Sequence, residues 1–159
     1  MSKETVIPII DIFAGPGGLG EGFSSYSANG HHPFKIKLSV EKDEYAHKTL
    51  LLRSFFRQFP EGEAPDLYYE ALQQKFPLKE LPDRLKLKSE SLWLKWQEAT
   101  DEAIHAELGG SKSSCDTISS KIVTALGSNN QPWILIGGPP CQAYSLAGRV
   151  RNKGIKNYR

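Results

Sequence analysis

The feature that most restricts the fold is an apolar run at residues 6–13 that leads directly into a glycine-rich turn, "VIPIIDIFAGPGGLG". A continuous β-branched run of this length indicates a strand buried on both faces, as in a parallel sheet. Glycines allow the chain to turn sharply and its backbone to approach a ligand closely. The following helix would offer unpaired N–H groups and the positive end of its dipole to an anionic group. We therefore expect a strand, a tight turn, and a helix that begins near Leu19 and ends before Asn29.

Four further segments show the patterns of regular structure. Residues 34–41 alternate apolar and polar side chains and predict a second strand. We expect a helix from Glu44 to about Phe59, a helix over residues 116–126 with Asp116 or Thr117 as its N-cap, and a strand at residues 133–137. The first of these helices would bury five apolar side chains, Tyr45, Leu51, Leu52, Phe55 and Phe59. This order predicts an α/β fold with a mostly parallel sheet and a ligand site beyond the carboxyl ends of the strands.

The middle of the chain differs in character from both ends. With 159 residues the chain has the size of one domain, but prolines recur at positions 60, 65, 77 and 82, and polar residues dominate between them. We predict a mainly helical insertion at about residues 60–110. Inside it, residues 91–108 place apolar side chains at helical spacing, so Leu92, Trp93 and Trp96 are expected to pack as ordinary helix core.

Glu41 stands at the end of the second predicted strand. Its distance from the glycines, about 20 residues, is typical of the carboxylate that holds ribose hydroxyls in nucleotide sites. Gly15, Gly17 and Gly20 have the GxGxxG spacing, which alone is a weak signal that also fits a turn needing positive φ. The two features together predict an adenosyl cofactor, but they do not separate a nicotinamide dinucleotide from S-adenosylmethionine.

Cys141 follows the third predicted strand through a rigid Gly-Gly-Pro-Pro segment. A cysteine in apolar surroundings is usually a small buried hydrophobe. Here the two prolines, the polar Gln142 and the cations downstream favour an accessible thiol whose thiolate is stabilised, that is, a nucleophile. The other cysteine, Cys115, is distant in sequence, and neither shows the spacing of a disulfide framework or a zinc site.

Three stretches in this order, "DIFAGPGGLGEGF", "VEKD" and "GGPPCQAYSLAGR", resemble motifs of the DNA cytosine-C5 methyltransferases. The resemblance implies a Rossmann-like fold that binds S-adenosylmethionine and methylates carbon 5 of cytosine in DNA. It also implies that the Cys141 thiolate adds to carbon 6 of a cytosine flipped out of the duplex. The resemblance covers roughly the first 43 and the last 23 residues, and the middle matches nothing familiar.

The resemblance also assigns roles to further residues. Gln142 and Ser145 would face DNA. Arg149 and Arg151 belong to a basic arm at residues 149–159 without an acidic residue, which would meet phosphates. Glu41 would hold the ribose of the cofactor. The methionine and adenosine side of the cofactor pocket would be lined by Phe13, Ala14, Gly15, Gly17, Gly18 and Leu19.

Two departures from the family pattern shape further expectations. The 159 residues contain no Glu-Asn-Val motif, whose glutamate contacts the target base, and no target-recognition region. We therefore expect the N-terminal piece of a longer enzyme, inactive alone, whose partners are its remaining C-terminal part, duplex DNA and a cognate restriction endonuclease. The interval between Glu41 and Cys141 is also unusually long. Consequently the residue that contacts the adenine of the cofactor is not assigned, and the turn at residues 108–110 is named only as a guess for it.

Three alternatives remain at this point. A tRNA cytosine methyltransferase would share the motifs, a nicotinamide-dependent oxidoreductase would use the glycines and Glu41, and a non-catalytic module would keep the cofactor pocket alone. Neither a run of about 20 apolar residues nor a secretory cleavage site is present, so a cytoplasmic location is expected. The four histidines show no ligand spacing, and we expect surface roles for them.

Overall fold

The computed structural model describes residues 6–28, 30–109, 115–127 and 131–139. Its centre is a sheet of the strands β1 (Ile7–Ile12), β2 (Phe34–Glu41), β3 (Ala103–His105) and β4 (Ile134–Gly137). The strands lie in the order β3-β2-β1-β4, and all neighbouring pairs are parallel. This confirms the predicted α/β class with a parallel sheet. Within the described residues, no helix has the length and apolarity needed to cross a membrane.

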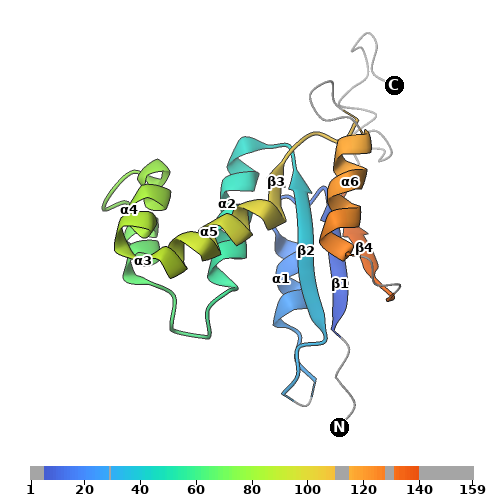
Figure 1. Cartoon of the computed structure of the whole chain (residues 1–159), viewed down its shortest axis with the longest axis horizontal. Coiled ribbons are helices and arrows are strands. Elements are labelled where there is room, and N and C mark those ends of the chain that lie inside the picture. Colours follow the sequence, from blue (N-terminus) through green and yellow to red (C-terminus); the bar gives the residue numbers. More distant parts are fainter. Residues whose placement is uncertain (1–5, 29, 110–114, 128–130, 140–159) are drawn as a thin grey trace, which may run out of the picture.

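Helices cover both faces of the sheet (Figure 1). α1 (Gly18–Ser25) and α2 (Glu44–Phe56) pack on one face, where Gly20 faces Ile36 of β2. α6 (Cys115–Leu126) packs on the other, where Ile118 joins the buried cluster of Ile10, Leu38 and Val40. Apolar side chains on both sides of β1 and β2 explain why β1 reads as a continuous apolar run.

An irregularity in β2 decides which of its side chains reach each layer. The register with β1 shifts so that Ile9 pairs with Ile36 and Ile10 with Leu38, which leaves Lys37 as an extra residue. Such a bulge interrupts the alternation of the strand. Ile36 therefore faces α1, while Leu38, two residues later, faces α6.

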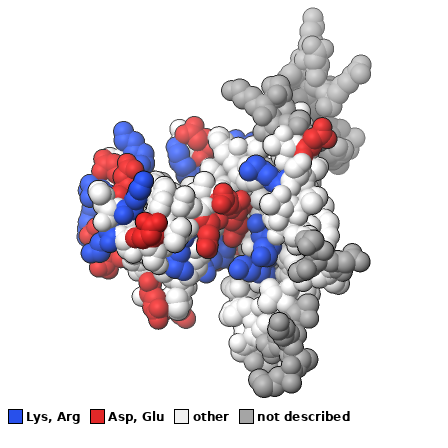
Figure 2. All heavy atoms as spheres, viewed as in Figure 1, with Lys and Arg blue, Asp and Glu red and all other residues white. Residues whose placement is uncertain are grey.

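The middle of the chain forms a helical extension beside the sheet (Figure 1). It comprises α3 (Asp66–Leu72), the short 3-10 helix η1 (Leu78–Glu80), α4 (Leu81–Lys88) and α5 (Glu90–Glu102). Phe55 of α2, Leu81 and Leu85 of α4 and Trp96 of α5 share one buried cluster. On the face shown in Figure 2, acidic and basic side chains intermingle over this extension.

The helix predicted over residues 91–108 ends earlier, and this prediction was wrong in its second half. α5 stops at Glu102, and Ala103 adopts extended angles, φ −96 and ψ 100. Residues 103–105 then form β3, paired with Ser39, Val40 and Glu41. The backbone groups at this edge of β2 gain hydrogen-bond partners that a continued helix could not supply, so tertiary pairing overrides the helical pattern.

Two details of the predicted helices also need correction. Tyr45 was expected on the buried face of α2 but is 77% exposed, whereas Leu50, which was not expected there, is 1% exposed. Leu50 packs against Ala14 and Ala103, contacts that only the folded sheet brings to it. α6 begins at Cys115, which places Asp116 in its first turn rather than at the N-cap.

Arg57, directly after α2, joins three helical elements. Its guanidinium lies 2.5 Å from Glu102 Oε1 at the end of α5 and 3.2 Å from Glu21 Oε2 in α1. The Arg57 side chain is only 13% exposed, and that of Glu102 is nearly as buried. Because Glu102 directly precedes β3, this ion-pair cluster fixes the point at which the helical extension returns to the sheet.

Candidate functional site

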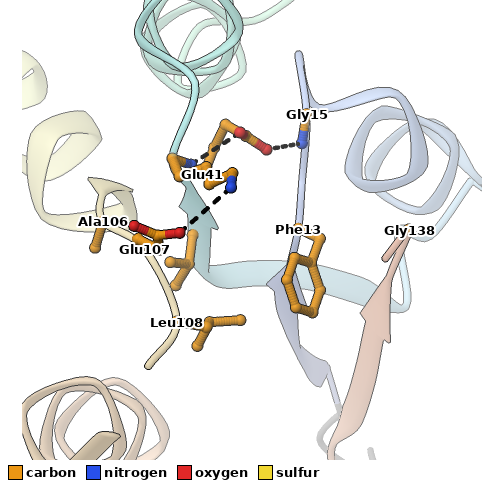
Figure 3. Close-up of a pocket in the computed structure, with 9 residues that line it drawn as sticks. Phe13, Gly15, Glu41, Ala106, Glu107, Leu108 and Gly138 are labelled. Atoms are coloured by element: carbon orange, nitrogen blue, oxygen red, sulfur yellow. Dashed lines mark hydrogen bonds and ion pairs between the residues drawn. The ribbon is translucent and has the colours of Figure 1, made fainter. Parts of the chain in front are cut away.

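A cavity of about 280 Å³ opens where β1, β2 and β3 end (Figure 3). This is the carboxyl edge of the sheet, where ligands of parallel α/β folds bind. Phe13 and Gly138 lie on one side, and Ala106, Glu107 and Leu108 lie across from them. The full lining consists of Phe13, Gly15, Val40, Glu41, Lys42, Ala106, Glu107, Leu108 and Gly138.

Glu41 is held rigidly in this cavity by backbone amides. Gly15 N–H donates to Glu41 Oε2 over 2.7 Å, and the amides of Lys42 and Asp43 donate to Oε1 over 2.8 and 2.7 Å. The first bond ties the turn after β1 to the end of β2. A carboxylate has about four acceptor sites, so capacity remains for about one hydroxyl donor of a ligand.

The turn between β1 and α1 depends on left-handed backbone conformations. Phe13 and Gly15 both have φ of 57, and Gly17 has φ of 90. A side chain at Gly17 would also place its Cβ 2.9 Å from Leu50 Cδ1. Phe13 holds its conformation without the freedom of glycine, at a cost of about 1–3 kcal/mol. Its strained backbone directs the ring into the cavity (Figure 3).

The predicted cofactor residues separate into two groups in the structure. Phe13, Gly15 and Glu41 line the cavity, as does Leu108 from the turn guessed for the adenine. The other four do not line it. Ala14 is buried against Leu50, Gly17 approaches α2, Gly18 begins α1, and Leu19 is exposed on α1.

Of the far wall of the cavity, Leu108 belongs to the turn that was guessed from the sequence, but Ala106 and Glu107 were missed. Ala106 N–H donates to the backbone carbonyl of Glu41 over 2.9 Å, and Lys42 Nζ lies 3.3 Å from Glu107 Oε1. These contacts exist only because β3 pairs with β2. The sequence signal that could have revealed the wall is the apolar pair Ala103-Ile104, placed between a charged helix and Gly109.

Two histidines have structural roles beside this wall, which corrects the expectation of surface roles alone. His47 Nε2 donates to the carbonyl of Ala103 over 3.0 Å, and His105 Nε2 donates to that of Lys42 over 2.9 Å. Their rings stack with centroids 4.9 Å apart. They fasten β3 to α2 and to the segment after β2. Among the described residues, no group of three or more His, Cys, Asp or Glu side chains is placed to hold a metal ion.

Asp11 lies in β1, behind the glycine turn. It is 0% exposed, and neither carboxylate oxygen has a hydrogen-bond partner among the described residues. Burial raises the pKa of this carboxyl from 3.8 to about 6, although the nearby Gly20 amide and the Arg57 guanidinium oppose the rise. At neutral pH the group is therefore mainly ionised although it is completely buried.

This buried charge predicts a distinctive pH dependence of stability. Because the folded state binds the Asp11 proton more tightly than the unfolded state, ionisation of Asp11 destabilises the fold as pH rises from 4 to 7. Relative to Asp11→Asn, the wild type should lose about 2–3 kcal/mol of unfolding free energy over this range, measured by urea denaturation. Asp83→Asn, at an exposed position of α4, serves as the control and should show no such difference. Parallel pH profiles of wild type and Asp11→Asn would contradict the prediction.

The predicted catalytic and DNA-facing residues, Cys141, Gln142, Ser145, Arg149 and Arg151, lie outside the described residues. The described segment that ends at residue 139 nevertheless directly precedes them in the sequence. β4 pairs with β1 so closely that a side chain on Gly137 would meet Ile12 O at 2.1 Å. Gly138 follows and lines the cavity, three positions before Cys141.

Comparison with known proteins finds a similarity in sequence to a methyltransferase. No protein-family model matches the chain, and no solved structure matches it. The chain is 30% identical over 168 aligned residues to the Type II methyltransferase M.Bpa9945I of Bacillus paralicheniformis. The alignment covers 91% of this chain but 33% of the relative, so the chain spans about a third of the relative's length. Over nearly its whole length, this Rossmann-like α/β chain is thus similar to part of a Type II methyltransferase.

Proposed function

We propose that this chain is the cofactor-binding part of an enzyme that transfers a methyl group from S-adenosylmethionine to carbon 5 of cytosine in duplex DNA. The observation that carries the proposal is the cavity that joins Phe13, Gly15 and Glu41 at the carboxyl edge of the sheet, with Gly138 leading toward Cys141. The similarity to a Type II methyltransferase supports methyl transfer and a role in a restriction-modification system.

The cavity has the chemistry of a nucleoside site. Its volume, about 280 Å³, lies near the lower end of small-molecule pockets, roughly 300 Å³. Glu41 would accept a hydrogen bond from a ribose hydroxyl with its remaining acceptor site. The Phe13 ring and the Leu108 side chain offer apolar surfaces to a flat base. Glu107, on the wall across from Phe13, would accept a hydrogen bond from the amino group of adenine.

Bound S-adenosylmethionine would supply an electrophilic methyl group. The residues of this chain would prepare the base to receive it. The Cys141 thiolate adds to carbon 6 of the flipped cytosine, which makes carbon 5 nucleophilic. Loss of the carbon-5 proton and expulsion of the Cys141 thiolate then restore the aromatic ring. Gln142 and Ser145 would face the DNA, and Arg149 and Arg151 would bind its phosphates.

The enzyme we propose needs two functional groups that the 159 residues of this chain do not supply. A carboxylic acid near N3 of the cytosine would promote addition of the thiolate, and a target-recognition region would read the bases in the major groove. We assign both to a C-terminal part of the same enzyme, since the chain spans about a third of the relative. We also propose that the enzyme acts together with a cognate restriction endonuclease and that it is located in the cytoplasm.

Methyl transfer by the full-length protein tests this function. We expect transfer of radiolabelled methyl groups from S-adenosylmethionine to duplex DNA, recovered as 5-methylcytosine after digestion. Glu41→Gln should raise the Kd for S-adenosylmethionine at least roughly tenfold, because an amide accepts fewer hydrogen bonds than a carboxylate. Glu61→Gln, at an exposed position, is the matched control.

The same assay decides between this function and its alternatives. Labelling of tRNA but not of DNA would replace the DNA substrate by tRNA. Binding of S-adenosylmethionine without any transfer would favour a non-catalytic module. Calorimetric binding of NAD but not of S-adenosylmethionine would overturn the proposal in favour of an oxidoreductase.

A further inference from the structure

Lys42 connects the two carboxylates that line the cavity. Its backbone amide donates to Glu41 Oε1 over 2.8 Å, and its side-chain ammonium donates to Glu107 Oε1 over 3.3 Å. Its own carbonyl accepts a hydrogen bond from His105 Nε2 over 2.9 Å, which ties the Lys42 backbone to the end of β3. One residue therefore contacts both the carboxylate that we assign to the ribose and the carboxylate that we assign to the adenine.

The ion pair between Lys42 and Glu107 should add little to the stability of the fold. The two side chains are 62% and 60% exposed, and exposed ion pairs gain little over solvation by water. Both residues line the cavity, and Lys42 is the one basic residue among the described lining residues. No other described residue forms an ion pair or a hydrogen bond with the Glu107 side chain. The direction of the Glu107 carboxylate at the cavity therefore depends on Lys42.

A carboxylate held in one direction can distinguish between purine bases. An ionised carboxylate accepts hydrogen bonds and donates none. Lys42 contacts Oε1 of Glu107, so the second oxygen remains for a ligand. This oxygen suits the 6-amino group of adenine, which is a donor, and opposes the 6-oxo group of hypoxanthine, which is an acceptor. A site that hydrogen-bonds one group of a ligand discriminates against the analogue that lacks the group.

We infer that Lys42 is a positioning residue that, through its ion pair with Glu107, makes the cavity select a 6-aminopurine nucleoside over the 6-oxo analogue. The inference rests on the proposed function, in which Glu107 accepts a hydrogen bond from the adenine of S-adenosylmethionine. Lys42 acts on the base only through Glu107. Its effect on the choice of base should therefore disappear when Glu107 no longer carries a carboxylate.

Calorimetric titration of the full-length protein with S-adenosylhomocysteine and S-inosylhomocysteine tests the inference. The wild type should bind the adenosyl compound at least roughly tenfold more tightly. Lys42→Met should reduce this preference roughly three- to tenfold, whereas Lys42→Arg should keep it, because a guanidinium also pairs with a carboxylate. Lys48→Met is the matched control, since Lys48 forms a similarly exposed pair with Glu44 but does not line the cavity. Its preference should equal that of the wild type.

A double variant shows whether Lys42 acts through Glu107. Glu107→Gln should itself reduce the preference, because an amide can donate to the 6-oxo group as well as accept from the 6-amino group. When Glu107→Gln is already present, Lys42→Met should change the preference less than about twofold. If Lys42→Met reduces the preference by the same factor with and without Glu107→Gln, Lys42 acts independently of Glu107 and the inference is overturned.

The outcomes separate this inference from the function on which it rests. If neither nucleoside binds to the wild type, the proposed function fails and the inference fails with it. If both bind but Lys42→Met weakens them equally, Lys42 only supports the wall and the inference alone is overturned. If Lys42→Met does not fold, Lys42→Gln, which keeps a polar side chain at this exposed position, replaces it and should show the same loss of preference.

Discussion

Replacing Cys141 by serine should abolish covalent capture of the full-length protein on duplex DNA that contains 5-fluorocytosine. In the mechanism proposed here, the thiolate adds to carbon 6 before the methyl group is transferred, and fluorine at carbon 5 blocks the proton loss that would release the enzyme. A serine hydroxyl is a far weaker nucleophile at neutral pH than a thiolate. We expect a complete loss of the adduct on denaturing gels and a fall in methyl transfer of at least about 10³-fold.

Cys115→Ser is the matched control for this experiment, because it makes the same chemical change at the other cysteine of the chain. It should leave the adduct intact. An adduct that survives Cys141→Ser, or that disappears with Cys115→Ser alone, would exclude Cys141 as the nucleophile. Binding of S-adenosylmethionine should persist in Cys141→Ser, which separates the loss of chemistry from a loss of the cofactor site.

Arg57→Met should lower the unfolding free energy by roughly 1–3 kcal/mol, between the values for exposed and for buried ion pairs, measured by urea denaturation at neutral pH. Arg57 is the cation between Glu21 and Glu102, and burial already raises the pKa of the Glu102 carboxyl despite Arg57. Removing the guanidinium leaves this carboxyl buried without its partner. Because Glu102 leads directly into β3, the variant should also weaken cofactor binding through the wall at residues 106–108.

Arg84→Met supplies the comparison. Arg84 also pairs with a glutamate, Glu80, but both side chains are more than 40% exposed, and such pairs contribute about 0–1 kcal/mol. The double variant Arg57→Met with Glu102→Leu should recover part of the lost stability, since it removes both partly buried charges. A loss below about 1 kcal/mol in Arg57→Met would show that this ion pair does not hold α5 and α1 together.

Local patterns account for the parts of the fold that could be predicted. The strand at residues 34–41 and the start of the helix at Glu44 agree with β2 and α2 as observed. Asp43 caps α2 by accepting from the Ala46 amide over 2.8 Å, a contact between residues three apart. Such elements depend on period and on neighbouring residues, which the sequence displays directly.

Long-range pairing accounts for the errors. β3 has only three residues and lies at the end of a convincing helical pattern, so its one local signal, the apolar pair Ala103-Ile104, fits a helix equally well. Its pairing partner is more than 60 positions earlier in the chain. The burial of Leu50 also could not be predicted, because it depends on contacts with Ala14 and Ala103, which are distant in the sequence.

The candidate site divides in the same way. The glycine turn and the position of Glu41 at the end of a strand could be predicted from the sequence, because strand, turn and acidic residue follow one another in the chain, and the structure places Phe13, Gly15 and Glu41 in the lining of one cavity. The structure was needed to show that Lys42, Ala106 and Glu107 complete the cavity and that Asp11 is buried. These positions depend on which segments the sheet brings side by side, and burial, which sets the electrostatic effect of a carboxylate, is a property of that packing.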